Sequence, residues 1–561
     1  MQRNDFVDYL DQYNVLSPNH SKIYDEYTYE DDELSKYAFS IETNIEEYLI
    51  EIFKENPRSI ILSGNAGDGK TRLCRRVFNS LTSVEMQSWS SEGIVDVTCL
   101  NNQIIIVKDL SELSENKIQS ILMDLEISIK EKKNKYYLIA ANEGKLTQAL
   151  TQEGMDYLQE KVRKRFESHI NNDQELGIIN LQDVTSSVYA ERIIKEWTKK
   201  EYWNQCESCP LSQDCIIFHN YEKLKEPKIQ KKLVNQYRTL DYLSEHITMR
   251  EMLIHLAYTI TGSLKCDDIY SEDMELRDAH FNKVYYENYY GASAINGQAE
   301  KIQALKALRT IDPGNYSFST IDDFIINGDI SGDPKLESEH FSLIDDSIDL
   351  QRGYFKNQLN MYRDHNEKIT YEDISFWIYK LRRKLFFEAN EELFAVEKLL
   401  PFEYIKDFKE IMSENKINEF KKMLVPSLNR SFSRKLIDPI FVKNLYAINE
   451  TLLIKNTFKR GELILEIEPT REEIDHLPSK LILKIKGNEE IKLNINLAVF
   501  EYLMRLHGGG THNILKNEVE ILVDTFRNEL MTLENEVGDD LEILKYDYLK
   551  GLYIESELSI D

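Results

Sequence analysis

The first third of the chain alternates short apolar runs with stretches of helical periodicity. The apolar runs resemble buried strands and lie at 59–62, 94–100, 103–107, 136–141 and 177–181. The stretches between them predict helices at 72–81, 114–132 and 153–169. Asn101-Asn102 separates two of the strands and suits a tight turn, because asparagine tolerates the left-handed conformation. Strands that alternate with helices predict a parallel sheet.

Beyond residue 183 the helical period dominates, until a β alternation returns near the C-terminal end. Leu481, Leu483 and Ile485 share one face of an expected strand. Gly487-Asn488 supplies a turn into the next strand, which contains residues 491–495. These changes divide the chain into an acidic arm at 1–44, an α/β core at 45–183, a cysteine-containing helical segment at 184–265, a helical domain at 266–450 and an α+β module at 451–561.

Charge and composition narrow the possible function classes. The 561 residues include 69 Lys and Arg against 97 Asp and Glu, which gives a formal net charge of −28. A protein that coats nucleic acid or anionic lipid with its whole surface is basic, so any DNA contact must come from local patches or partner proteins. Six cysteines are too few for a disulfide scaffold, and no apolar run approaches membrane-spanning length. We therefore expect a cytoplasmic protein that has neither a membrane anchor nor a secretion signal.

Residues 64–71 match the phosphate-binding pattern G-x-x-x-x-G-K-[ST] completely. An apolar strand precedes the match and a helix follows it, and the match itself reads Gly64-Asn65-Ala66-Gly67-Asp68-Gly69-Lys70-Thr71. The three glycines let backbone amides approach an anion that a Cβ would hold away. Lys70 is expected to reach the β- and γ-phosphates of ATP, and the Thr71 hydroxyl to ligate Mg²⁺. The alternative is a glycine-rich turn that carries Lys-Thr by chance.

Hydrolysis also needs an acid for the metal and a group that orients water. Asp109 ends an apolar run and is the candidate Mg²⁺ ligand, although Leu110 follows it where many such ATPases have Glu. Its competing role is to cap the helix that follows. Glu112 and Glu143 are the two candidates for the water-orienting acid. Asn142 occupies the place of a polar sensor that faces the γ-phosphate.

Three arginines lie at positions in the chain where AAA+ modules have functional arginines. Arg163 and Arg165 precede the strand at 177–181, where such modules present an arginine finger to a neighbouring subunit of a homo-oligomer. The alternative for both is a solvated basic helix end, which the helix dipole favours. Arg250 opens a later helix and resembles a second sensor arginine at the nucleotide.

A cysteine cluster in the segment at 184–265 has the spacing of a metal knuckle. Zn²⁺ takes four sulfur or nitrogen ligands, and a C-x-x-C turn supplies two of them. The expected ligands, within 14 residues, are Cys206, Cys209, Cys215 and His219. Cys266 is a rival fourth ligand, an iron–sulfur cluster is a rival occupant, and unrelated buried cysteines are the alternative without metal. The predicted fold class is an α/β P-loop NTPase with an AAA+-like parallel sheet, followed by a helical lid with a zinc knuckle, a helical region and a small α+β module.

Four basic islands interrupt the acidic chain. They lie at 161–165, 228–232, 382–384 and 430–435. Such islands bind phosphates in some proteins, but more often they pair with neighbouring acids on the surface. The chain contains no convincing set of paired carboxylates with a lysine, so we expect no nuclease activity from this chain alone.

Several of these strings together resemble one protein family. They are residues 62–71, 106–112 and 139–144, and the cysteine cluster followed by Thr248-Met249-Arg250. Over residues 45–265 the chain is similar to the DptF (DndF-type) ATPases of DNA phosphorothioation-dependent restriction, a bacterial antiphage defence system. That resemblance implies an AAA+/STAND-like ATPase subunit that works with helicase- or nuclease-like partners on DNA. The alternative is a signal-transduction ATPase that binds ATP, oligomerises and recruits an effector without acting on DNA, and a third possibility is a scaffold that binds nucleotide for stability alone.

Overall fold

The computed structural model divides the chain into two compact units. Unit 1 comprises Met1–Leu240, His246–Leu399 and Arg471–His476, and unit 2 comprises Asp241–Glu245, Leu400–Thr470 and Leu477–Asp561. The residues that the structure describes are 3–23, 35–151, 155–168, 175–270, 279–294, 297–328, 332–414, 416–434, 437, 443–448, 454–510, 517–533 and 540–559.

Unit 1 contains a five-stranded sheet in the order β2-β3-β4-β1-β5. The strands are β1 (Ser59–Ser63), β2 (Ile94–Cys99), β3 (Asn102–Val107), β4 (Lys135–Ala141) and β5 (Leu176–Asn180). β1 pairs in parallel with β4 and β5, and β3 pairs in parallel with β4. The expected α/β architecture is therefore present, with β1 between two parallel neighbours.

The sheet is mixed rather than wholly parallel, because β2 runs antiparallel to β3. The two strands are joined directly by Leu100 and Asn101, which have positive φ angles of 47° and 71°. A two-residue turn can connect only antiparallel strands, since a parallel pair needs a long crossover. The turn expected at Asn101-Asn102 lies one residue earlier, at Leu100-Asn101, because Asn102 already pairs with Cys99 in the ladder.

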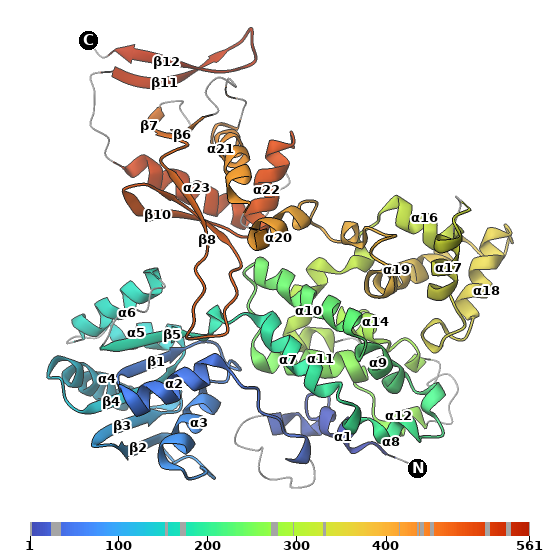
Figure 1. The fold of residues 1–561 in the computed structure, drawn as a ribbon, viewed down its shortest axis with the longest axis horizontal. Helices are drawn as coiled ribbons and strands as arrows, with labels where there is room; N and C mark the ends of the chain where they lie inside the picture. Colours follow the sequence, from blue (N-terminus) through green and yellow to red (C-terminus); the bar gives the residue numbers. More distant parts are fainter. Residues whose placement is uncertain are drawn as a thin grey trace. The chain divides into compact units, whose positions relative to one another are not determined.

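Helices cover both faces of this sheet (Figure 1). α2 (Asn44–Glu55) packs on α3 (Lys70–Thr82), and α3 contacts β2, β3 and β4. On the other face, α4 (Glu115–Lys130), α5 (Glu143–Leu150) and α6 (Asp156–Ser168) join a single hydrophobic cluster with the sheet. Ile61 and Ile139 face this cluster, whereas their neighbours Ile60 and Leu138 are buried outside it, which is the two-residue period of a strand covered on both sides. The buried sheet therefore holds the loops at its carboxyl edge in fixed places.

The rest of unit 1 is helical. Its helices are α1 (Asp5–Asp11), α7 (Ser186–Trp197), α8 (Asn204–Glu207), α9 (Ile216–Leu224), α10 (Pro227–Tyr242), α11 (Met249–Thr261), α12 (Cys266–Ile269), α14 (Tyr285–Tyr289), α15 (Gln303–Leu308), α16 (Ser319–Asn327), α17 (Pro334–Leu343), α18 (Tyr354–Arg363) and α19 (Tyr371–Glu388). In the described part of the chain, no helix combines the length and the apolar character that crossing a bilayer requires.

The N-terminal segment is not the solvated acidic arm that its charge suggested. Phe6, Tyr9 and Leu10 of α1 are buried, because their spacing places them on one face of the helix. The Phe6 ring stacks on Tyr202 at 4.7 Å between ring centroids and meets Trp203 edge-on at 5.6 Å. The most acidic stretch, Asp25–Glu33, lies outside the described residues. The first residues of the arm expected at 1–44 therefore form a helix that packs within unit 1.

The basic island at 382–384 lies inside unit 1 and not on a phosphate-binding surface. Its three side chains are buried, and each pairs with an acid at 2.7–2.8 Å. The pairs join Arg382 to Asp322, Arg383 to Asp312 and Glu287, and Lys384 to Asp349. Buried ions need such partners, because an unpaired buried charge is costly. The pairing alternative therefore holds for this island.

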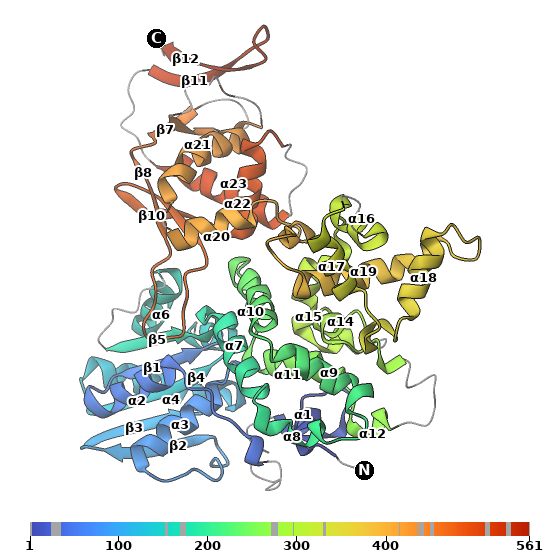
Figure 2. The same cartoon turned by 45° about the vertical axis from the view of Figure 1, so that its right-hand side comes forward.

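Unit 2 is built from two helix pairs and three small sheets. Its elements are α20 (Ile405–Glu414), α21 (Ile417–Ser433), β6 (Asn444–Ile448), β7 (Ile454–Lys459), β8 (Leu463–Ile467), β9 (Leu481–Ile485), β10 (Asn488–Ile495), α22 (Leu497–His507), α23 (Asn517–Thr532), β11 (Asp540–Asp547) and β12 (Leu552–Ser559). The strand pair expected on either side of Gly487 is present as β9 and β10. The unit begins near residue 400 and not at the expected 450, because α21 packs on β6 and α22 (Figure 2).

Candidate functional site

The glycine-rich loop at 64–71 connects the buried strand β1 directly to α3. Gly67 and Gly69 have φ angles of 100° and 85°, a conformation that residues with a Cβ rarely adopt. Gly69 is the N-cap of α3, so the helix begins at Lys70 with its first amides directed toward the loop. The sequence motif and the local geometry therefore agree on a loop whose backbone is able to surround an anion.

Lys70 lies at the centre of this loop. Its Nζ donates to the carbonyl oxygens of Gly64 at 2.8 Å and Asn65 at 2.7 Å. The residue is only 9% exposed, and this burial lowers the pKa of the lysine, while the nearby carboxylates of Asp68 and Asp109 act in the opposite direction. The loop therefore folds around an ammonium group that neutral carbonyls hold in place.

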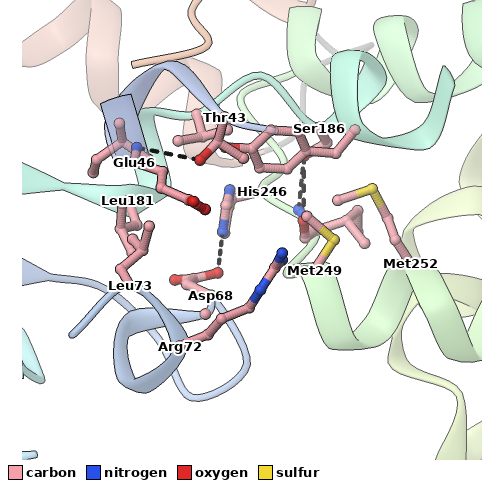
Figure 3. A pocket seen from close by; sticks show the side chains of 15 residues that line it. Thr43, Glu46, Asp68, Arg72, Leu73, Leu181, Ser186, His246, Met249 and Met252 are labelled. Atoms are coloured by element: carbon pink, nitrogen blue, oxygen red, sulfur yellow. Dashed lines mark hydrogen bonds and ion pairs between the residues drawn. The ribbon is translucent and has the colours of Figure 1, made fainter. Parts of the chain in front are cut away.

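A second set of contacts fixes the shape of the loop from outside. The Asp68 carboxylate accepts a hydrogen bond from the Asn65 amide at 2.6 Å and contacts His246 Nε2 at 2.8 Å (Figure 3). Gln182, just beyond β5, donates to the Asn65 side chain at 3.1 Å. His246 and Gln182 are far from the loop in sequence, and no motif marks either residue, so sequence reasoning missed both.

The start of α11 packs directly against the loop. Thr248 caps α11, and the Arg250 amide donates to the Gly67 carbonyl at 3.2 Å. A Cβ on Gly67 would lie 3.0 Å from both the Arg250 Cβ and the Thr248 Oγ1. Arg250 also acts electrostatically on Lys70. The structure thus brings the expected sensor arginine next to the loop.

The neighbouring strands end at the same edge of the sheet. Ala141 pairs with Ser63, so Asn142 and Glu143 follow β4 directly beside the start of the loop. Asp109 follows β3 on the next strand and lies within electrostatic reach of Lys70. Asp109 also accepts hydrogen bonds from the Ser111 amide at 2.8 Å and hydroxyl at 2.6 Å, which is the capping role that the sequence left open. Both roles are therefore compatible at this position.

The structure does not bring Glu112 or the arginine-finger candidates to the loop. Glu112 has a side chain that is 57% exposed and pairs with Lys108 at 3.0 Å. Arg163 pairs with Glu160 at 2.9 Å on the exposed side of α6. Arg165 is 8% exposed, and the charges around it include those of Arg471 and Asp183 of its own chain. An arginine finger acts on the site of a neighbouring subunit, so this role stays a prediction for both residues.

An apolar pocket lies beside the loop. Leu73, Leu181 and Met252 provide apolar walls, and the side chains of Thr43, Glu46, Arg72 and His246 add polar groups to the lining (Figure 3). These residues come from the start of α2 with the residue before it, from the first turn of α3, from the segment after β5, and from the start of α11 with the residues before it. The pocket is a product of packing between distant segments, and no sequence motif predicts it.

The segment Arg471–His476 supports the wall of this pocket. Asp475 accepts from the amide of Asn44 at 3.0 Å, at the start of α2, and pairs with Arg192 at 2.8 Å. Its backbone carbonyl accepts from the Thr185 amide at 2.9 Å. One aspartate therefore ties the start of α2 to the segment after β5, although it is 431 residues from Asn44 in sequence and far from Thr185 as well.

The cysteine cluster lies elsewhere in unit 1, around α8, α9 and α12. Cys206 is part of α8, Cys215 caps α9, and Cys266 begins α12. Burial raises the pKa of Cys206 to about 11 and of Cys215 to about 12. Among the described residues, no group of three or more His, Cys, Asp or Glu side chains is already arranged as a metal site.

Comparison of the chain with protein-family models, with curated proteins and with solved structures found no match. The site must therefore be interpreted from its own geometry and chemistry.

Because α11 packs closely on the loop, a methyl group added at Gly67 should destabilise the protein. Gly67→Ala adds both a strained positive φ and a contact at 3.0 Å with the start of α11. Because Gly487 has a φ of 85° but no atom within 4 Å of an added Cβ, Gly487→Ala is the matched control for backbone strain alone. We expect Gly67→Ala to destabilise the protein by about 1–3 kcal/mol more than the control, as measured by thermal unfolding. Equal effects of the two substitutions would contradict the tight packing of α11 on the loop.

Proposed function

We propose that the protein binds and hydrolyses Mg·ATP at the loop 64–71. The observation that carries this proposal is the position of Lys70, held at the centre of a glycine-rich loop between a buried strand and a helix N-terminus. Asp109 and Asn142 extend from the two neighbouring strands at the same edge of the sheet. This is the set of groups that phosphoryl transfer requires: amide donors, a cation and an acid for the metal.

The loop supplies the phosphate contacts. The Lys70 ammonium donates hydrogen bonds to the carbonyl oxygens of Gly64 and Asn65. When nucleotide binds, the ammonium would exchange these bonds for charge-assisted bonds to the β- and γ-phosphates. The Thr71 hydroxyl and the Asp109 carboxylate would hold Mg²⁺, which favours oxygen ligands and keeps several waters. Arg250 would add positive charge on the side of α11.

The base of the nucleotide would occupy the adjacent pocket. Apolar side chains, which suit the faces of a purine ring, line much of this pocket, and Thr43 and His246 add polar groups to the lining. The pocket shares Asp68 and Gly69 with the phosphate loop, so one molecule with a base and phosphates would fill both. This arrangement favours a nucleotide over an inorganic phosphate as the ligand.

Removal of the Lys70 charge tests nucleotide binding. Lys70→Ala should weaken Mg·ATP binding about a hundredfold, because it deletes charge-assisted bonds to the phosphates. Lys195→Ala is the matched control, since Lys195 pairs with Glu191 on the surface of the same unit and is 64% exposed. Isothermal titration calorimetry with both variants measures the effect. Unchanged ATP affinity in Lys70→Ala would refute the proposed site.

The geometry favours Glu143 over Glu112 as the acid that orients water. Glu143 is half-buried at the start of α5, next to the loop, whereas Glu112 points into solvent and pairs with Lys108. Glu143→Gln should therefore lower the steady-state rate of ATP hydrolysis about a hundredfold while nucleotide affinity stays unchanged. Glu112→Gln should leave the rate within about twofold. The reverse pattern would transfer the role to Glu112.

We further propose that this ATPase is a subunit of a multi-protein DNA-restriction or antiphage complex. This role rests on the resemblance to the DptF-type ATPases, and two observations support delegated DNA contact. The net charge is −28, and the basic island at 382–384 is consumed by buried ion pairs. Helicase- or nuclease-like partners would then carry out the DNA processing.

A nucleotide-gated switch is the second candidate function. The contact of α11 with Gly67 favours it, because a ligand in the loop would act directly on the start of a helix in the helical part of unit 1. ATP turnover that duplex DNA stimulates severalfold would support the restriction subunit. ATP-dependent oligomerisation of the pure protein with DNA-independent turnover would support the switch.

A further inference from the structure

Four of the six cysteines gather in one place in unit 1. Cys206 interacts electrostatically with both Cys209 and Cys266, and Cys215 interacts with Cys206 and Cys266. Cys266 lies outside the spacing of the C-x-x-C motif, and it reaches the group because α12 brings it there. The other two cysteines lie apart, Cys74 in α3 and Cys99 at the end of β2. The fold therefore brings Cys266 close to the three cysteines at 206–215, which are distant from it in the sequence.

Hydrogen-bond donors surround these sulfurs. The backbone amides of Ile217 and Phe218 donate to the sulfur of Cys215 at the start of α9. Turns that place two amides on one sulfur stabilise a thiolate, because a neutral thiol is only a weak acceptor. Donors of this kind form the outer shell of metal-bound cysteines.

Asn4 provides donors to two further cysteines. Its side-chain amide donates to Cys206 Sγ at 3.2 Å, and its backbone amide donates to Cys266. The fourth sulfur, of Cys209, contacts the hydroxyl of Tyr270 at 3.3 Å. Asn4 is itself 1% exposed, so its donors cannot be directed to water instead. Three of the four sulfurs thus accept hydrogen bonds, and the fourth lies within hydrogen-bond distance of a hydroxyl.

His219 does not belong to this group. Its side chain is partly buried on α9, which packs on the turn Ile348–Leu350, and the charges that act on it are those of Asp349, Glu388, Lys223 and Lys384. None of the four cysteines is among these neighbours, and burial lowers the pKa of His219. The charges that act on His219 therefore come from α9 itself, from α19 and from the turn at 348–350, and not from the cysteines.

We propose that the four cysteines bind a single Zn²⁺ ion as a closed tetrahedral site: Cys206, Cys209, Cys215 and Cys266. Binding would draw the four thiols to the metal by rotation about their Cα–Cβ bonds, and four thiolates satisfy the coordination of zinc completely. A closed site leaves no position for substrate, so the ion is structural.

The proposed site would hold three chain segments together. Asn4 contributes the first turn of the N-terminal segment, Cys206 to Cys215 contribute the knuckle, and Cys266 contributes α12. The same segments also meet through the stacking of Phe6 on Tyr202. The site lies outside the glycine-rich loop, so it is independent of the proposed nucleotide binding.

Metal analysis of the full-length protein tests the ligand set. Inductively coupled plasma mass spectrometry should find about one zinc per chain in the wild type, in His219→Gln and in Cys99→Ser. Cys266→Ser should lose most of this zinc. Cys99→Ser is the matched control, because Cys99 is a partly exposed cysteine outside the cluster. Zinc loss in His219→Gln with zinc retained in Cys266→Ser would overturn the proposal in favour of the Cys₃His set.

Cobalt substitution tests the same proposal without a variant that has to fold. Wild-type protein refilled with Co²⁺ should show the strong thiolate-to-cobalt charge-transfer absorption of a tetrahedral site with four sulfur ligands. Absorption that corresponds to three sulfurs, or a wild-type protein that contains iron or no metal, would overturn the tetrathiolate zinc site.

Discussion

The structure of the candidate site depends on how a buried ammonium group is held. Lys70 is almost completely buried, and its charge is satisfied by two carbonyls of the loop that precedes it. The loop can take this path because Gly67 and Gly69 adopt positive φ angles, and because β1 and α3 fix its two ends. Our proposal is that this cation, together with the backbone amides of the loop and of the start of α3, binds the phosphates of ATP.

Distant parts of unit 1 converge on this loop. Strand pairing places Asp109 and Asn142 at the same edge of the sheet as the loop. The start of α11 places Arg250 beside the Gly67 carbonyl, which accepts a hydrogen bond from the Arg250 amide. Asp475 ties together the segments that wall the neighbouring pocket. Nucleotide binding at the site would therefore change contacts made by helices well beyond the sheet. A motor and a switch both require such coupling between ligand binding and conformation.

The sequence predicted best what is local. The glycine-rich loop, the strands on either side of it and the turn near Asn101 are all encoded within short windows, where residue type and backbone conformation are directly linked. The sequence predicted poorly what depends on packing between distant segments. His246 reaches Asp68 across the fold, Cys266 lies near Cys206 although its spacing in the sequence does not reveal this, and Arg165 is buried and not part of a solvated helix end. The N-terminal segment was likewise predicted from its acidic residues, although Phe6 and Leu10 lie on an apolar face of a helix in this segment.

Hydrogen–deuterium exchange of the full-length protein, measured with and without Mg·ATP, tests the central claim most directly. The account predicts slower amide exchange at 64–71, where the loop would surround the phosphates, and at 43–46 and 246–252, which wall the adjacent pocket. Saturating nucleotide that leaves exchange at 64–71 unchanged, or that protects only segments away from the carboxyl edge of the sheet, would contradict it.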